Sequence, residues 1–488
     1  MRRGAVLILT LSAALVTALV AALRAGVMPL GVRGEWEWLP VLFPANPRDI
    51  GLAVAAVAVY AGFVGRVRAA LDGRVTRWKE SVAVLALLAA SITTQAVVPC
   101  GAPVGYGLAK WAIVLHEKGS TGYFLVARNE VHDLRRFLAE YPRWIARRDA
   151  LHIGTHPPGL IVVEAVLLRF FQGAPAASRI VESYTPESVA LAFRLFDGPS
   201  PLSHADRATI AVTGMLTLLC CAATVVPLYL LARASLPAPS AWTTAALWPL
   251  VPSAVLFQPT ADTAFPLLSA SALALAAHSG RLSRRGGGLA SVVGGMVLGV
   301  AMQFTLGFLA VGLVVAIILG TARGKSRDER LALIAATGIG FVSLTALVWV
   351  STTANPFETW WWNLINHARF YDQFPRSYLP WVVANPVELA VGLGLPVAVW
   401  TVVGLVSGRG APTVGPASAV VLVLLTISGK NLSEVGRLWL PMMPALLVAA
   451  GHGFNRLHAG PKSLAATTAL LGAQTLALQA TIQVVYPF

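Results

Sequence analysis

Residues 4–23 read GAVLILTLSAALVTALVAAL, a run of twenty residues without a charge that follows Arg2 and Arg3. A helix needs about 20 mostly apolar residues to cross the hydrocarbon core of a bilayer. The alternative is a signal peptide, but the run is longer than a usual signal core and no clear small-x-small cleavage site follows it. The stretch therefore predicts a first spanning helix with its N-terminus in the cytoplasm.

The composition of the whole chain agrees with this first stretch. Of its 488 residues, 56% are hydrophobic and 12% are charged, whereas soluble proteins carry about 25% charged residues. This excludes an ordinary soluble enzyme and a disordered protein. The net charge of +15 is typical of basic cytoplasmic loops, so no nucleic acid partner is expected. The three cysteines, Cys100, Cys220 and Cys221, lack metal-ligand spacing, and no metal site is predicted.

Apolar runs recur to the end of the chain and predict an all-α polytopic membrane protein with about thirteen transmembrane helices. Residues 1–488 would form a single integral membrane domain. The residues Gln303-Phe304-Thr305 mark a turn inside the long apolar run 289–321. After 4–23, spanning helices are expected at 50–65, 81–99, 208–232, 241–257, 263–279, 288–303, 304–321, 331–350, 386–406, 415–428, 437–451 and 463–483.

The short apolar run 158–172 decides the topology of everything after it. If it does not cross, eleven basic residues fall in the later cytoplasmic loops and four fall outside; if it crosses, the ratio inverts. The positive-inside rule favours the first option, with a short helix that dips in or lies at the outer interface. The eleven are Arg233, Arg281, Arg284, Arg285, Arg323, Lys325, Arg327, Arg330, Arg409, Arg456 and Lys462, and the four are Arg369, Arg376, Lys430 and Arg437.

Residues 100–207 then form a large extracytoplasmic loop region, in which we expect short amphipathic helices. Within 129–148, apolar residues recur at i, i+3, i+4 and i+7. They are Leu134, Phe137, Leu138 and Tyr141. A helix with such a stripe is suited to lie flat on the membrane surface.

Polar residues that suggest chemistry gather on the predicted outer face. The stretch HIGTHPPG (152–159) places Thr155 and His156 before two prolines that open an apolar helix. Free N–H groups and the positive dipole end of a helix favour an anionic head group there. A plain helix-capping segment is an equally good interpretation.

Three further outer segments carry charged residues. Asp262, in the turn QPTADT (258–263), would either cap the next helix or act in catalysis. In GKNLSEVGR (429–437), Glu434 and Arg437 are three residues apart and would pair, or Arg437 would bind a lipid phosphate. The cluster 366–372 (NHARFYD) is interpreted as a solvated face.

Three segments follow one another along the chain: THPPG (155–159), PTAD (259–262) and NLSEVGRLWLPMMP (431–444). Together, and in this order, they resemble the motifs of the GT-C superfamily of multi-spanning glycosyltransferases. That group includes protein O-mannosyltransferases and lipid A aminoarabinose transferases. The resemblance covers most of the chain after about residue 81. It implies a GT-C-like fold in the inner or plasma membrane, with an extracytoplasmic active site. The implied activity is transfer of a sugar from a polyprenyl-phosphate donor to an acceptor.

The resemblance also implies roles for individual residues. His156, Arg437 and Lys430 would bind the donor phosphate. Thr155 would support His156, and Glu434 would hold Arg437. Asp262 would orient the acceptor or the site as part of the catalytic set.

The chain departs from the superfamily in its acidic residues, because 100–156 lacks the acidic doublet that commonly precedes the proline motif. Glu130 and Asp133, three residues apart on the amphipathic stretch, are the preferred base candidates. Glu35 and Glu37 are rivals, although the flanking tryptophans favour an interfacial anchor. The sequence does not identify a cofactor, the donor sugar or the acceptor.

A transporter or flippase of a lipid-linked sugar is the alternative function. It predicts polar residues along a path through the membrane, but the polar residues within the predicted spans are few and are mostly amides near helix ends. A non-catalytic assembly subunit is a third hypothesis. The Gly295–Gly299 pair has the small-xxx-small spacing of helix contacts, and packing within the chain explains it as well as dimerisation does.

Overall fold

The structure is a computed structural model that describes residues 3–27, 30–73, 75–148, 151–196, 201–406 and 414–485. Arg409, one of the basic residues counted above, lies outside them. Within the described residues the chain is almost entirely helical. Two small antiparallel pairs of strands complete it, β1 (Gly31–Val32) with β2 (Trp36–Glu37) and β3 (Leu39–Pro40) with β4 (Ile482–Gln483). The predicted all-α class is confirmed.

The longer helices follow the predicted apolar runs. They are α1 (Arg3–Arg24), α2 (Pro47–Ala70), α3 (Arg77–Val97), α11 (His204–Ala223), α12 (Val225–Arg233), α15 (Phe265–Ser279), α16 (Arg284–Ala301), α17 (Phe308–Gly320), α18 (Arg327–Thr352), α20 (Tyr378–Leu393), α21 (Leu395–Val406), α22 (Val414–Ser428), α24 (Met443–Arg456) and α25 (Pro461–Thr481). The turn predicted at Gln303-Phe304-Thr305 separates α16 from α17.

Among the described residues, five helical segments are long and apolar enough to cross a membrane: α1, α2, α3 with the residues after it, α11 with α12, and α18. The number rises to seven if each of two bent helix pairs counts as one span. These helices support the prediction of a membrane protein. Thirteen spans and the orientation of the chain in the membrane stay predictions.

Three predicted spans are broken by residues that interrupt helices. The run 241–257 divides into α13 (Ala238–Ala246), a 3-10 turn η3 (Trp248–Leu250) and α14 (Pro252–Leu256), because prolines at 249 and 252 cannot donate helical hydrogen bonds. Helices α20 and α21 bend by 108° around Gly394, which has φ +96°. The predicted helix 437–451 starts only at Met443, after the short helix α23 (Val435–Leu438) and the 3-10 turn η5 (Leu440–Met442).

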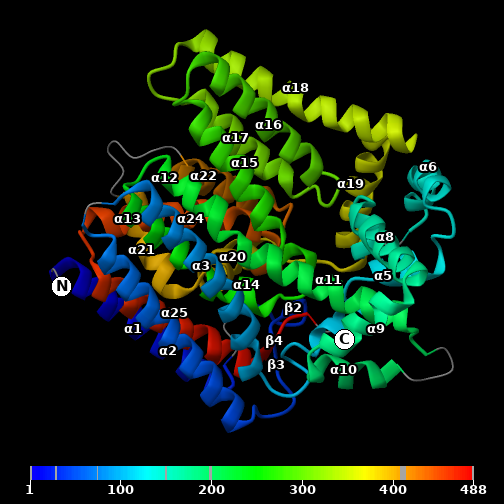
Figure 1. Cartoon of the computed structure of the whole chain (residues 1–488), viewed down its shortest axis with the longest axis horizontal. Coiled ribbons are helices and arrows are strands. Elements are labelled where there is room, and N and C mark those ends of the chain that lie inside the picture. The colour runs from blue at the N-terminus through cyan, green and yellow to red at the C-terminus, as the bar shows by residue number, and fades with distance from the viewer. Residues whose placement is uncertain are drawn as a thin grey trace.

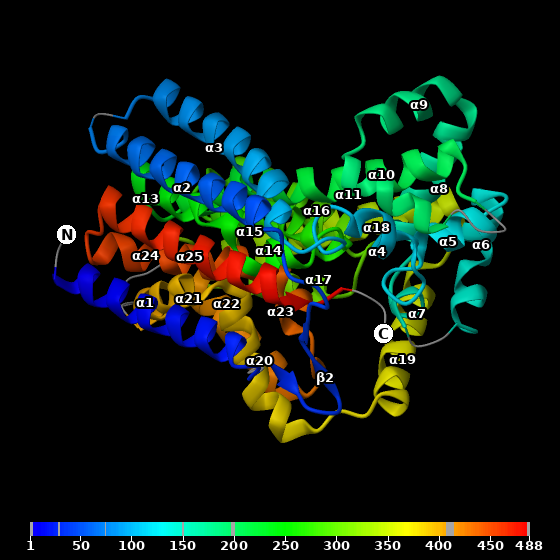
Figure 2. The same cartoon turned by 90° about the horizontal axis from the view of Figure 1, so that it is seen from below.

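The region 100–207 is built of short helices at one end of the molecule, where Figure 1 and Figure 2 also place α19 (Pro356–Gln373). The ambiguous run 158–172 forms α8 (Gly159–Gly173), which bends by 110° into α9 (Pro175–Tyr184), so the pair is either a broken span or a re-entrant loop. The other elements are η1 (Val98–Gly101), α4 (Lys110–His116), α5 (Tyr123–Asn129), α6 (Leu134–Ile145), α7 (His152–Thr155), α10 (Glu187–Phe193) and η2 (Arg194–Phe196).

Helix α6 carries the predicted amphipathic stripe, but protein covers much of it. Phe137 and Tyr141 belong to one apolar cluster with Val126 of α5 and Ile161 of α8. The exposed fraction of Tyr141 is 0%. The helix therefore packs its apolar face inward, and the expectation that this face rests on the membrane surface is wrong.

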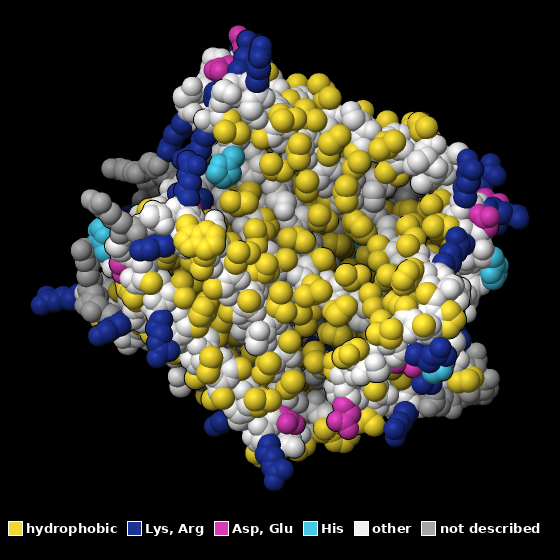
Figure 3. Space-filling view, viewed as in Figure 1, with side chains coloured by type: hydrophobic (Ala, Val, Ile, Leu, Met, Phe, Trp, Pro, Cys, Tyr) yellow, Lys and Arg dark blue, Asp and Glu magenta, His cyan; other side chains and the backbone are white. Residues whose placement is uncertain are grey.

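The surface shown in Figure 3 is apolar over its centre, and Lys and Arg side chains stand around its edge. Large hydrophobic side chains are exposed along the long helices, among them Leu7, Val59, Leu85 and Ile339, each at least 60% exposed. An exposed apolar surface of this extent is typical of contact with lipid.

Candidate functional site

A small polar pocket lies where segments from three parts of the chain meet. Its volume is about 20 Å³, room for a single water-sized group. The region 100–207, the turn before α15 and the end of α23 all contribute to it. The lining residues are Ser120, Thr121, Tyr123, His152, His156, Leu160, Thr260, Ala261, Asp262, Phe265, Arg437 and Leu438. The three predicted residues His156, Asp262 and Arg437 thus line one pocket.

Arg437 is the cation of this pocket, and two carboxylates face it. Its Nε lies 3.7 Å from Oδ2 of Asp262, and its Nη2 lies 2.5 Å from Oε2 of Glu434. The side chain of Arg437 is 11% exposed, and its buried Nε has no hydrogen-bond partner. One N–H of the guanidinium is therefore left for a further acceptor.

Asp262 sits in the 3-10 turn η4 (Ala261–Thr263) and does not cap the following helix. The residue at the N-cap of α15 is Ala264, which makes no side-chain cap hydrogen bond. Burial raises the pKa of the Asp262 carboxyl, and the nearby Arg437 charge opposes this rise. The capping role that the sequence left open for Asp262 is absent, and its Oδ2 lies near the guanidinium of Arg437.

The turn before α23 brings Glu434 and Arg437 together by adopting a strained backbone. Ser433 and Glu434 have φ of 102° and 55°, values that L-residues rarely adopt. The next turn of chain is held by Glu388 of α20, a fully buried acid whose Oε1 accepts from the Gly436 N–H at 2.9 Å. Sequence reasoning missed Glu388 because it lies within an apolar run far from any motif.

His152 of α7 and His156, the residue that follows this helix, are uncharged near neutral pH. Burial, together with the Arg437 charge, holds the pKa of His152 well below its usual range and lowers the pKa of His156 to about 4. Nδ1 of His156 lies 2.9 Å from the carbonyl oxygen of His152, so that nitrogen carries the proton and Nε2 is an acceptor. Arg437 is therefore the cation next to a neutral His156, and phosphate binding by these two residues stays a prediction.

Helix α19 fixes the backbone of the histidine segment. Asn363 donates to the carbonyl oxygens of Gly154 and His156, and Asn366 donates to those of Gly154 and Ile145, all at 3.0–3.1 Å. Both asparagines are fully buried. The interpretation of 366–372 as a solvated face is therefore wrong for its first residue.

The start of α8 is closed by protein groups. The Gly159 N–H donates to the carbonyl oxygen of Gln303 at 2.9 Å, and a Cβ at Gly159 would collide with that oxygen. The hydroxyl of Thr155 bonds to backbone carbonyls of its own turn, at Leu151 and His152, and contacts Nδ1 of His156. Thr155 thus supports His156, while the glycine N–H is already engaged.

The other predicted residues lie outside the pocket lining. Glu130 accepts from Trp144 and pairs with Arg148. Asp133 is exposed and caps α6, where its Oδ1 accepts from the Arg136 N–H at 2.8 Å. Both preferred base candidates are therefore engaged in structural contacts.

The remaining candidates also lie outside the pocket lining. Lys430 has an exposed side chain, and its carbonyl oxygen accepts from His367 and Tyr371. Glu35 accepts from Ser377 and Trp381 and so ties the first loop to α20. Glu37 lies in strand β2.

Tyr123 is the pocket residue that sequence reasoning missed most clearly. It is buried, its ring lies 6.0 Å from that of His156, and burial raises the pKa of its phenol. It therefore stays protonated and can donate a hydrogen bond. Ser120, Thr121 and Thr260 add hydroxyl groups to the same lining.

The site combines a carboxylate, a guanidinium, two neutral imidazoles and several hydroxyls. Among the described residues, no three His, Cys, Asp or Glu side chains come together in a way that could hold a metal ion. Comparison of the sequence with protein-family models finds no match, and comparison with curated proteins finds none either.

Proposed function

We propose that this protein is an integral-membrane glycosyltransferase that moves a sugar from a polyprenyl-phosphate donor to an acceptor on the extracytoplasmic face. The observation that carries the proposal is the pairing of Arg437 with Asp262 beside His156, from segments far apart in the chain. A cation and a carboxylate in one partly buried pocket are what the transfer of a phosphate-activated sugar needs.

In the proposed reaction an acceptor hydroxyl attacks the anomeric carbon of the donor sugar, and the bond from that carbon to the phosphate oxygen breaks. Asp262 takes the proton of the hydroxyl. Arg437 stabilises the charge on the departing polyprenyl phosphate, to which its unpartnered Nε–H can donate. Glu434 holds the guanidinium in place, and the neutral imidazole of His156 accepts a hydrogen bond from a sugar hydroxyl.

The core between the two ends of α15 argues against the transporter alternative. Asp262 precedes the helix, and Ala270, Ala272, Leu273 and Ala274 along it are buried, each no more than 5% exposed. Apolar side chains packed this closely leave no room for a polar path along this face of α15.

The test is release of polyprenyl phosphate by the purified protein from a panel of polyprenyl-phosphate sugars. Arg437→Gln and Asp262→Asn should each lower release at least about 100-fold. Arg179→Gln, an exposed position on α9, is the matched control and should leave release unchanged. No release from any donor by the folded protein, or full release by both pocket variants, would overturn the proposal.

A further inference from the structure

A second cavity lies at the far end of α15 from Asp262. The helix has 15 residues, so its ends are about 22 Å apart. The cavity has a volume of about 120 Å³ and opens among the ends of α12, α15 and α17 and the start of α22. Its lining residues are Ala234, Ser235, Ala276, Ala277, Gly280, Arg281, Ile318, Thr321, Ala322, Arg323 and Val414.

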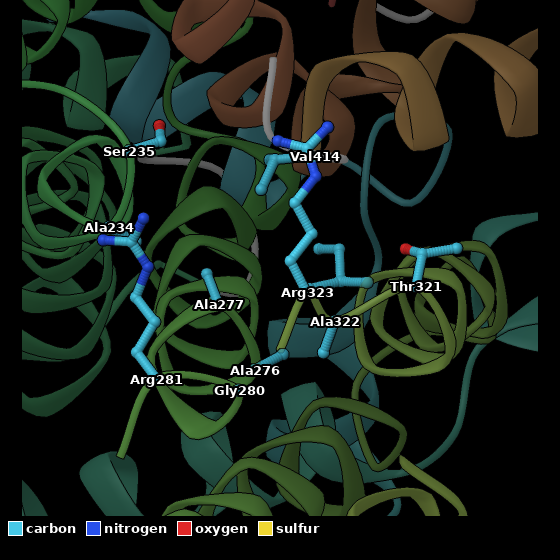
Figure 4. Close-up of a pocket in the computed structure, with 11 residues that line it drawn as sticks. Ala234, Ser235, Ala276, Ala277, Gly280, Arg281, Thr321, Ala322, Arg323 and Val414 are labelled. Atoms are coloured by element: carbon cyan, nitrogen blue, oxygen red, sulfur yellow. The ribbon is translucent and has the colours of Figure 1, made fainter. Parts of the chain in front are cut away.

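Two arginines from different connections form the charged part of this cavity. Arg281 comes from the α15–α16 connection and Arg323 from the α17–α18 connection. Figure 4 shows their side chains on either side of Ala277, both extending in the same direction. A guanidinium presents several donors in a planar fork that matches the oxygens of a phosphate.

The rest of the two connections strengthens the positive charge. In the two connections and the first turns of the helices that follow them, basic residues outnumber the acidic ones, Asp328 and Glu329. Glu329 is already engaged by the Ser326 N–H and by Lys325. The further basic residues of the two connections and the helix starts that follow them are Arg284, Arg285, Lys325, Arg327 and Arg330.

The walls below the arginines are apolar and small. Ala276, Ile318 and Val414 are each no more than 5% exposed, and Gly280 and Ala277 also line the cavity. Ser235, at the rim, bonds to Nε2 of His452 at 3.0 Å. A charged mouth above an apolar wall at the ends of apolar helices is the arrangement that binds the head group and first chain carbons of an acidic lipid.

We propose that this cavity binds a phosphate group, carried by the head group of an anionic phospholipid, between Arg281 and Arg323. The small wall residues accept the part of the lipid next to the phosphate. The inference does not depend on the proposed transferase activity, because it concerns the opposite end of α15 and its test measures binding alone.

The test is native mass spectrometry of the detergent-purified full chain with phosphatidylglycerol or phosphatidylcholine, together with thermal unfolding in millimolar inorganic phosphate. The wild-type protein should retain phosphatidylglycerol and not phosphatidylcholine. Arg281→Gln with Arg323→Gln should lower retention at least about tenfold. Arg284→Gln with Arg285→Gln removes the same charge from the adjacent helix start, at residues outside the cavity lining, and should leave retention within about twofold of wild type.

A cavity-filling variant, Ala277→Leu, keeps both arginines and should also lose retention. If inorganic phosphate alone stabilises the wild type and not the Arg281/Arg323 variant, the site is a phosphate site whose ligand is soluble. Equal loss in the two double variants, or neither lipid retention nor stabilisation by phosphate, would overturn the proposal.

Discussion

Arg437 and Asp262 lie far apart in the sequence, yet Nε of the arginine is 3.7 Å from Oδ2 of the aspartate inside a pocket of about 20 Å³. The distance is too long for a hydrogen bond and short enough for strong attraction between the charges. The two charged groups therefore lie close together, while the Nε–H of Arg437 remains available as a hydrogen-bond donor. A ligand oxygen can take that position without breaking an existing hydrogen bond.

The geometry of Arg437 predicts that charge alone will not replace it. Arg437→Lys keeps a cation but loses the planar guanidinium, whose several N–H groups can contact Glu434 and a ligand in the pocket at the same time. We expect polyprenyl phosphate release to fall about tenfold or more in the lysine variant and about 100-fold or more in Arg437→Gln. The measurement is kcat and KM for the donor, with circular dichroism to check folding. Equal rates in Arg437→Lys and wild type would contradict a role for the fork.

The placement of the acids predicts which one acts as the base. Asp262→Asn should lower release at least about 100-fold, because the amide cannot take a proton. Asp133→Asn should not, because Asp133 is exposed and asparagine caps a helix as well as aspartate does. Single-turnover rates with both variants check this. A rate that falls in Asp133→Asn and not in Asp262→Asn would place the catalytic base in the segment 129–148.

The sequence predicted the long helices better than it predicted the breaks between them, and three of its candidate site residues, His156, Asp262 and Arg437, line one pocket. Runs of apolar residues located α1, α2 and α18 because hydropathy and length are properties of a single segment. The break at Gly394 and the strained turn at Glu434 depend on what each segment packs against, and a lone sequence does not record that.

The same limit explains the acids and the missed residues of the site. Glu130 and Asp133 have the spacing of a functional pair, but local partners engage both of them. Glu388 and Tyr123 lie in stretches without a motif, and only the tertiary fold brings them to Arg437 and its turn. Burial decides these cases, and burial is set by residues distant in the chain.

The lowered pKa values of His152 and His156 predict acid sensitivity of the fold. Below pH 6.5 the unfolded chain binds protons at both positions, whereas the folded protein keeps both histidines neutral, His156 down to about pH 4. Stability should therefore be fully present above pH 6.5 and be lost as the pH falls, by at most about 1.4 kcal/mol per pH unit for each histidine. Thermal unfolding from pH 7 to pH 5 measures this. His156→Gln should reduce the loss, and the exposed His132→Gln should not.

The small-xxx-small pair of α16 predicts a stability effect within one chain. A Cβ at Gly295 would collide with the carbonyl oxygen of Thr337 in α18, and one at Gly340 with that of Val292. Both glycines thus let α16 and α18 pack closely inside the protein. Since a backbone carbonyl cannot move aside easily, Gly295→Ala should destabilise the fold by about 1–3 kcal/mol.

Gly288, also in α16, is the matched control for this substitution, because nothing lies within 4 Å of the added Cβ. Gly288→Ala should be neutral or stabilise the protein by up to about 1 kcal/mol through helix propensity. Thermal unfolding and the mass of the protein in detergent separate the two explanations of the glycine spacing. If Gly295→Ala instead left unfolding unchanged and converted an oligomer to a monomer, the pair would serve association between chains.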